Sequence, residues 1–134
     1  MRTMPLALLA AALLAGCAPR DPPPDAVYRA FARATADHDA EAAWALLSAS
    51  TRRWLEAGAA AAAARAPGVV AAAGPRLLLG DAASGVRPVK EIEILRQDGE
   101  QALLRVVDAG GAAAQVTLVR EGGGWRLEIP PPPG

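Results

Sequence analysis

The strongest constraint on the fold is a change in hydrophobic period at Pro88. After this residue, apolar and polar side chains alternate over four short segments, which is the two-residue period of half-buried β-strands. Asp98-Gly99, Gly110-Gly111 and Gly122–Gly124 separate the segments, and aspartate and glycine tolerate the backbone angles of tight turns. The pattern predicts a four-stranded antiparallel meander that ends at Pro130, because proline cannot donate to a strand ladder. The side chains assigned to its apolar face are Ile92, Ile94, Ala102, Leu104, Val106, Ala114, Val116, Leu118, Trp125, Leu127 and Ile129.

Before the strands, the apolar residues recur with a helical period. Val27, Phe31 and Ala34 fall on one face of a helix predicted over residues 25–36. Because each predicted strand has one apolar face and only the helices can cover it, the sequence predicts an α+β fold. In this fold the N-terminal helices pack on one face of a four-stranded antiparallel meander sheet.

Two further helices are expected between the first helix and the strands. Asp39 is suited to cap the second, and either Ser48 or Ser50 could cap a third that continues toward an alanine tract. Pro67 stops that tract, because a proline inside a helix removes a hydrogen bond and clashes with the preceding turn. For residues 76–80 the sequence leaves a helical turn and a strand as open alternatives.

Residues 1–16 have the organisation of a secretory leader. Arg2 gives a positive start, and Leu6–Ala15 is an apolar stretch too short to span a bilayer as a mature helix. Leu14-Ala15-Gly16-Cys17 looks like a bacterial lipobox, where the leader is removed and the cysteine thiol forms a thioether to a diacylglycerol. The alternative is an ordinary secretory leader with an incidental cysteine. Cys17 is the only cysteine of the chain and has no disulfide partner, which favours lipidation.

The leader also predicts a domain order and a location. Three consecutive prolines favour an extended spacer, and eight such residues would hold the domain roughly 25 Å from the anchor. By resemblance to lipoprotein sorting in Gram-negative bacteria, Ala18 in place of aspartate implies the outer membrane, facing the periplasm. The expected location is therefore the bacterial cell envelope. The predicted segments are a signal peptide over 1–16, a lipidated cysteine with a proline-rich spacer over 17–25, one α+β domain over 26–129 and a proline-rich tail over 130–134.

Three segments of the predicted domain together resemble a known family. The first is an amphipathic opening helix followed by a turn into a second helix, Val27–Leu47, with DHDAEAAWALLS at the junction. The others are LSASTRRWL, Leu47–Leu55, and VTLVREGGGWRLEI, Val116–Ile129. Their order resembles small secreted or lipoprotein members of the nuclear transport factor 2-like superfamily, a cystatin-like cone of helices on a curved antiparallel sheet. The resemblance covers about residues 25–129. It implies a fold rather than an activity, because this fold hosts isomerases, dehydratases, binding modules and assembly components.

No set of residues in the sequence defines a catalytic centre, a metal site or a cofactor site. The resemblance implies that Tyr28 could hydrogen-bond a substrate, with Asp108 as the best carboxylate on a strand, although aspartate is also a normal turn residue. His38 lies between two aspartates, but neighbouring side chains rarely point at one ion, so a helix–helix turn is favoured. Because the basic residues are scattered and balanced by acidic ones, a nucleic-acid partner is not expected.

Five aromatic side chains are candidates to line a ligand pocket inside the cone: Tyr28, Phe31, Trp44, Trp54 and Trp125. The leading interpretation is a lipid-anchored, non-catalytic module that binds a small apolar ligand or an envelope protein and contacts the membrane through Cys17. The alternatives are an isomerase-like or dehydratase-like enzyme and an accessory component of an envelope assembly. The resemblance also implies a homodimer through the open sheet face, which four polar residues neither require nor exclude: Gln115, Thr117, Arg126 and Glu128.

Overall fold

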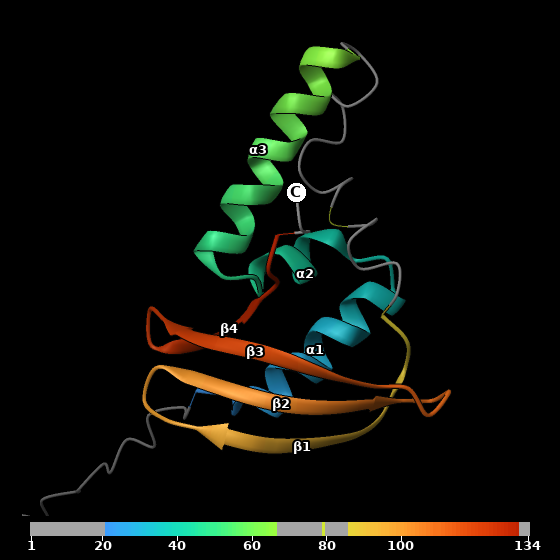
Figure 1. Cartoon of the computed structure of the whole chain (residues 1–134), viewed down its shortest axis with the longest axis vertical. Coiled ribbons are helices and arrows are strands. Elements are labelled where there is room, and N and C mark those ends of the chain that lie inside the picture. Colours follow the sequence, from blue (N-terminus) through green and yellow to red (C-terminus); the bar gives the residue numbers. More distant parts are fainter. Residues whose placement is uncertain (1–20, 67–78, 80–85, 132–134) are drawn as a thin grey trace, which may run out of the picture.

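The computed structural model describes residues 21–66, residue 79 and residues 86–131. The predicted signal peptide, Cys17 and the first part of the predicted spacer lie outside these residues, and so does the end of the predicted tail. Within them, three helices precede four strands, as the change in hydrophobic period predicts (Figure 1). No helix in the described part of the chain is long and apolar enough to cross a membrane.

The first two helices begin at the residues that the sequence signals favour. Helix α1 spans Pro24–Ala36, and a proline suits the first helical position because its missing N–H needs no partner there. Pro24 is buried, so α1 packs on the body of the protein from its first residue. Helix α2 spans Ala40–Ala45, and the carboxylate of Asp39 accepts a hydrogen bond from the Ala42 N–H as its N-cap.

The start of the third helix shows which of the two candidate serines is its N-cap. Helix α3 spans Ala49–Arg65, and the Ser48 hydroxyl accepts a hydrogen bond from the Thr51 N–H at 3.2 Å. Ser48 is therefore the N-cap, while Ser50 lies inside the first turn and donates to the carboxylate of Glu128. The helix runs through most of the alanine tract, as alanine's high helix propensity favours, and it ends just before Pro67.

The four strands form one antiparallel meander in the order β1-β2-β3-β4, which confirms the predicted sheet. In the β1–β2 turn, the Asp98 carboxylate accepts hydrogen bonds from the N–H groups of Glu100 and Gln101, both at 2.8 Å. The Asp98 carboxylate thus serves as the acceptor for N–H groups that a tight turn leaves without a backbone partner. The strands span Val89–Gln97 (β1), Gln101–Asp108 (β2), Ala113–Glu121 (β3) and Gly124–Glu128 (β4).

The helices cover one face of the sheet and enclose the core. Helix α1 lies across this face and contacts both outer strands, β1 and β4, while α2 packs on α1 and α3 reaches β4 (Figure 1). Leu104 and Leu118, on the two central strands, are completely buried. The other buried members of the core cluster are Val27, Phe31, Ala34, Ala43, Leu47, Leu55, Leu79, Ala102, Val106, Trp125 and Leu127.

Two of the predicted core positions are wrong. Ile94 is 41% exposed, because β1 is at the edge of the described sheet and gives this side chain a strand neighbour, Leu104, on one side only. The adjacent Leu95 is equally exposed, and the strand register shifts between Ile94 and Arg96. Ala114 is also exposed, near the β2–β3 hairpin, where the sheet extends beyond the helices (Figure 1).

The opposite edge of the sheet, at β4, is covered by the segment that joins α2 to α3. The Leu127 N–H donates to Leu46 O at 2.7 Å, and the Ser48 N–H donates to Leu127 O at 2.9 Å. The Thr51 hydroxyl accepts from the Ile129 N–H at 2.9 Å and lies 3.2 Å from Ile129 O. We call these hydrogen bonds the β4 edge contacts. They pair backbone groups that an outer strand otherwise leaves open.

Candidate functional site

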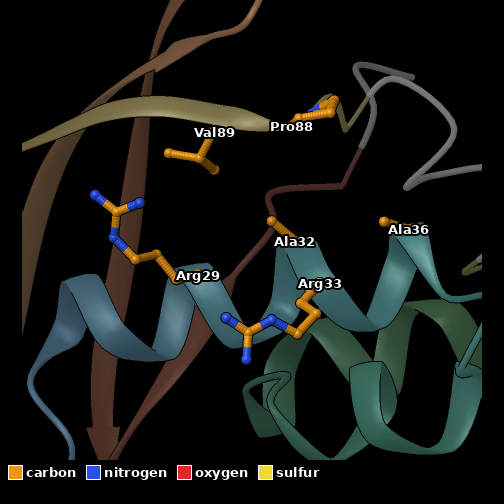
Figure 2. Close-up of a pocket in the computed structure, with 6 residues that line it drawn as sticks. All are labelled: Arg29, Ala32, Arg33, Ala36, Pro88 and Val89. Carbon is orange, nitrogen blue, oxygen red and sulfur yellow. The ribbon is translucent and has the colours of Figure 1, made fainter.

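The described part of the chain contains a groove between α1 and β1. Its helical side is a stripe of four residues at positions i, i+3, i+4 and i+7, which is distinct from the buried stripe of Val27, Phe31 and Ala34. The groove encloses about 230 Å³ and is largely open to solvent. We call it the α1–β1 groove (Figure 2). It is lined by Arg29, Ala32, Arg33, Ala36, Pro88 and Val89.

The chemistry of this groove is cationic and apolar. Arg29 extends toward β1 and Arg33 leaves the same face of the helix one turn later (Figure 2). The rest of the lining is carbon from alanine, proline and valine side chains. It contains no carboxylate, hydroxyl, thiol or imidazole. Such a surface can hold a ligand, but it offers no general base or nucleophile for a reaction.

The five aromatic candidates do not line this groove. Phe31 and Trp125 are 1% and 2% exposed and belong to the packed core. Trp54 is half-buried, and its indole N–H donates to Ile129 O at 2.8 Å. Trp44 is half-buried beneath the Arg52 guanidinium, 5.9 Å from the ring centre.

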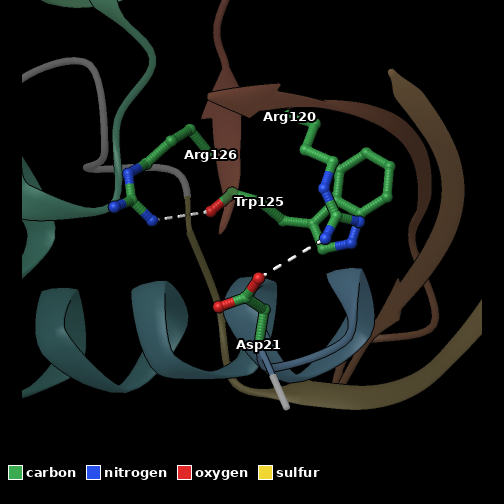
Figure 3. Close-up of polar contacts among 4 residues, drawn as sticks. All are labelled: Asp21, Arg120, Trp125 and Arg126. Atoms are coloured by element: carbon green, nitrogen blue, oxygen red, sulfur yellow. Dashed lines mark hydrogen bonds and ion pairs between the residues drawn. The ribbon is translucent and has the colours of Figure 1, made fainter. Parts of the chain in front are cut away.

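Trp125 also supports a polar cluster at the β3–β4 hairpin. The Arg120 guanidinium lies over its ring, with 5.5 Å between the guanidinium carbon and the ring centre. The same guanidinium pairs with the Asp21 carboxylate at 3.4 Å, and Arg126 donates to Trp125 O at 3.0 Å (Figure 3). The Arg120–Asp21 pair joins the segment that precedes α1 to strand β3. It is a weak contact energetically, because both ion-pair side chains are substantially exposed.

The Tyr28 phenol is half-buried and lies in the electrostatic field of the Asp108 carboxylate. Burial raises the pKa of the Tyr28 phenol above its ordinary value, and the negative charge of Asp108 raises that pKa further. The Tyr28 ring packs at 6.4 Å from that of Phe31. The Asp108 carboxylate, however, accepts hydrogen bonds from the N–H groups of Gly110 and Ala112, at 2.8 and 3.0 Å. Asp108 therefore has the turn role that the sequence left open.

The Tyr28 phenol is expected to ionise only above pH 10. Because its folded pKa is raised, the stability that it contributes is complete below the unfolded pKa and is lost as pH rises through the folded value. An ultraviolet titration follows it directly, since it is the only tyrosine. Asp108→Asn keeps an oxygen for the turn and should lower the Tyr28 pKa only partly, because burial is the larger cause. A phenol that titrates at its ordinary value would contradict this environment.

His38 lies in the turn that ends α1. Its φ of 54° is left-handed, its N–H donates to Thr35 O, and the Asp39 N–H donates to Ala34 O. These two hydrogen bonds form a Schellman motif, in which glycine is the usual residue at the position of His38. No group of three or more histidine, cysteine, aspartate or glutamate side chains in the described residues could hold a metal ion. The predicted helix–helix turn is confirmed.

His38→Gly is expected to raise the free energy of unfolding by about 1 kcal/mol, because glycine adopts positive φ without the steric cost of a Cβ. Chemical denaturation of the variant measures this gain. His38→Ala is the matched control, since it removes the imidazole but keeps the Cβ, and it should bring no gain. A loss of stability in the glycine variant would show that the imidazole itself makes a stabilising contact.

Arg29 and Arg33 were missed as site residues from the sequence. Their spacing in RAFAR was a usable signal, because residues four apart on a helix share a face. Pro88 and Val89 gave no such signal, since their position beside α1 depends on how the helix crosses the sheet.

Comparisons with protein-family models, with curated proteins and with solved structures found no match to this chain.

Proposed function

We propose that this protein is a non-catalytic binding module, lipid-anchored at Cys17 in the bacterial cell envelope, on the periplasmic side of the outer membrane. The observation that supports binding is the α1–β1 groove, whose lining combines two cations with apolar carbon and lacks a reactive group. The lipobox-like Leu14–Cys17 supports the anchor.

We also propose that the domain is a nuclear transport factor 2-like cone. Its support is the order of helices and meander strands, with α1 lying across one face of the sheet. In this family the fold alone does not select an activity, so the groove and not the fold is the basis for the binding function.

The anchor would hold the domain close to the membrane. Asp21 already contacts Arg120 on β3, and it lies four positions after Cys17, with three residues between them. A fully extended chain spans at most about 14 Å over four residues. This limit is shorter than the roughly 25 Å expected for an eight-residue polyproline spacer.

Cys17→Ser is expected to abolish incorporation of labelled palmitate, because serine has no thiol to form the thioether. Ala18→Ser is the matched control: it places a hydroxyl at the next position, keeps the cysteine and should leave labelling intact. Intact mass spectrometry of membrane fractions gives the mass of the attached lipid. Labelling that survives Cys17→Ser would refute the anchor.

A second candidate function, an isomerase-like or dehydratase-like enzyme, is supported by the half-buried Tyr28 near the charge of Asp108. Such an enzyme needs a phenol that can reach a substrate from a cavity. Its test is solvent access: iodination of Tyr28 by an external reagent in the native protein should be slow compared with that of the unfolded chain if the phenol is only structural. Rapid native iodination that a bound ligand suppresses would favour the enzyme.

A further inference from the structure

The two arginines of the α1–β1 groove are available to a ligand. Neither Arg29 nor Arg33 forms an ion pair or a side-chain hydrogen bond with another residue in the described ranges. Asp25 and Asp37 each lie one helical turn away, outside ion-pair distance of the arginines. Both arginine side chains are exposed, whereas Ala32 between them is 8% exposed and packs against the body of the protein.

This arrangement has an electrostatic cost that a bound anion would relieve. Like charges four residues apart on a helix repel each other. An oxyanion between the guanidinium groups would replace that repulsion with charge-assisted hydrogen bonds, which arginine makes in a two-pronged geometry with carboxylate or phosphate. The groove thus favours a ligand with a negative charge at the Arg29–Arg33 end.

The remainder of the lining favours a short apolar group. Ala36, Pro88 and Val89 present only carbon beyond their backbones. The volume of about 230 Å³ lies below the range of about 300–1,000 Å³ that is typical for drug-sized ligands. A long acyl chain would therefore extend out of the groove, while a chain of a few carbons would remain within it.

We infer that the α1–β1 groove binds a small amphipathic oxyanion, with the charged group on Arg29 and Arg33 and a short apolar group on Ala32, Ala36, Pro88 and Val89. This inference rests on the proposed binding function and replaces the apolar ligand expected from the sequence with an anionic one. The same chemistry is offered by a free alkyl phosphate and by the headgroup region of an anionic lipid.

The test is a binding titration of the full-length protein in a neutral detergent. The probes are inorganic phosphate, butyl phosphate, and the short-chain lipids dihexanoyl phosphatidylglycerol and dihexanoyl phosphatidylcholine. Butyl phosphate should bind more tightly than inorganic phosphate, because only the former reaches the apolar lining. Isothermal calorimetry gives each dissociation constant, and intact mass spectrometry reports whether Cys17 is lipidated in the same sample.

Variants assign the binding to the groove. The double variant Arg29→Gln/Arg33→Gln should weaken butyl phosphate binding at least tenfold, since it removes the charged hydrogen bonds of both guanidinium groups to the oxyanion. Arg33→Lys keeps the charge but loses the two-pronged geometry, so its loss should be intermediate. Arg53→Gln is the matched control, because Arg53 is exposed on α3 outside the groove and its loss should change nothing. Thermal unfolding of all variants confirms that each is folded.

Each outcome has one meaning. Arginine-dependent binding of butyl phosphate supports a free ligand, and arginine-dependent binding of phosphatidylglycerol alone supports a lipid headgroup. Absence of binding, equal binding of phosphate and butyl phosphate, or binding unaffected by the double variant overturns the inference. If a lipidated sample fails to bind, the inference fails while the anchor stands. If an unlipidated sample binds in the arginine-dependent way, the anchor fails while the groove stands.

Discussion

Leu104→Ala is expected to lower the free energy of unfolding by about 3–4 kcal/mol. Leu104 is completely buried on β2, between Ile94 of β1 and Val116 of β3. Its truncation removes buried apolar surface and leaves a cavity that the packed helices cannot fill. Because the total stability of a domain of this size is about 5–15 kcal/mol, this one change removes a large part of it. Denaturant unfolding followed by tryptophan fluorescence measures the loss, since Trp125 lies in the same core.

Leu95→Ala is the matched control, as it makes the same chemical change on the neighbouring strand. Leu95 is 41% exposed, so its truncation should cost less than about 1 kcal/mol. Similar losses in the two variants would mean that the helices do not cover the face of the sheet that bears Leu104. The packing of α1 across the sheet would then be wrong.

Thr51→Val is expected to lower the free energy of unfolding by about 2 kcal/mol. Thr51 is fully buried, and its hydroxyl accepts from the Ile129 N–H and lies 3.0 Å from the Ser48 hydroxyl. Valine has nearly the same shape but leaves the part-buried Ile129 N–H and the fully buried Ser48 hydroxyl without this acceptor. An unsatisfied buried donor costs about 1–3 kcal/mol. Equilibrium denaturation measures the change, and amide hydrogen exchange at Ile129 should become faster.

Thr117→Val tests whether the effect belongs to the β4 edge contacts. Thr117 is half-buried on β3, and no hydrogen bond of its hydroxyl occurs within the described residues, so the same substitution should change stability by less than about 0.5 kcal/mol. The Thr51 hydroxyl and the Trp54 indole N–H both donate to Ile129 O. Trp54→Phe is therefore a second comparison, because it removes only the indole donor and keeps an aromatic ring. If Thr51→Val proves as neutral as Thr117→Val, the hydrogen bonds of the Thr51 hydroxyl among the β4 edge contacts contribute nothing to stability.

Local signals in the sequence predicted the elements well. The turns at Asp98-Gly99 and Gly110-Gly111, with the alternating segments between them, were sufficient for the meander, because hairpins pair neighbours along the chain. The N-cap at Asp39 was equally local, since its acceptor lies three residues from its donor. The choice of Ser48 over Ser50 was not local: Ser50 is instead engaged by Glu128, far away in the sequence.

The predictions that failed share a physical cause: each depends on how the helices and strands lie relative to one another. The alternation that assigned Ile94 to the core is correct for its strand face, but burial also requires a neighbour that an edge strand lacks. The α1–β1 groove could not be predicted from the sequence for a similar reason. Arg29 and Arg33 could be placed on one helical face, but nothing in the sequence says that Pro88 and Val89 border that face.

The two outer strands of the sheet differ in whether their outward backbone N–H and C=O groups are free to pair with another chain. The β4 edge contacts occupy both backbone groups of Leu127 and of Ile129, while no strand of the described residues lies beyond β1. Growth of a sheet into a fibre requires two free edges on every copy, one to receive and one to extend. Copies of this fold that joined through β1 would therefore terminate at a pair. Glutamates 91 and 93 on that strand would face each other across a pairing centred on Ile92, so their repulsion opposes even this pair.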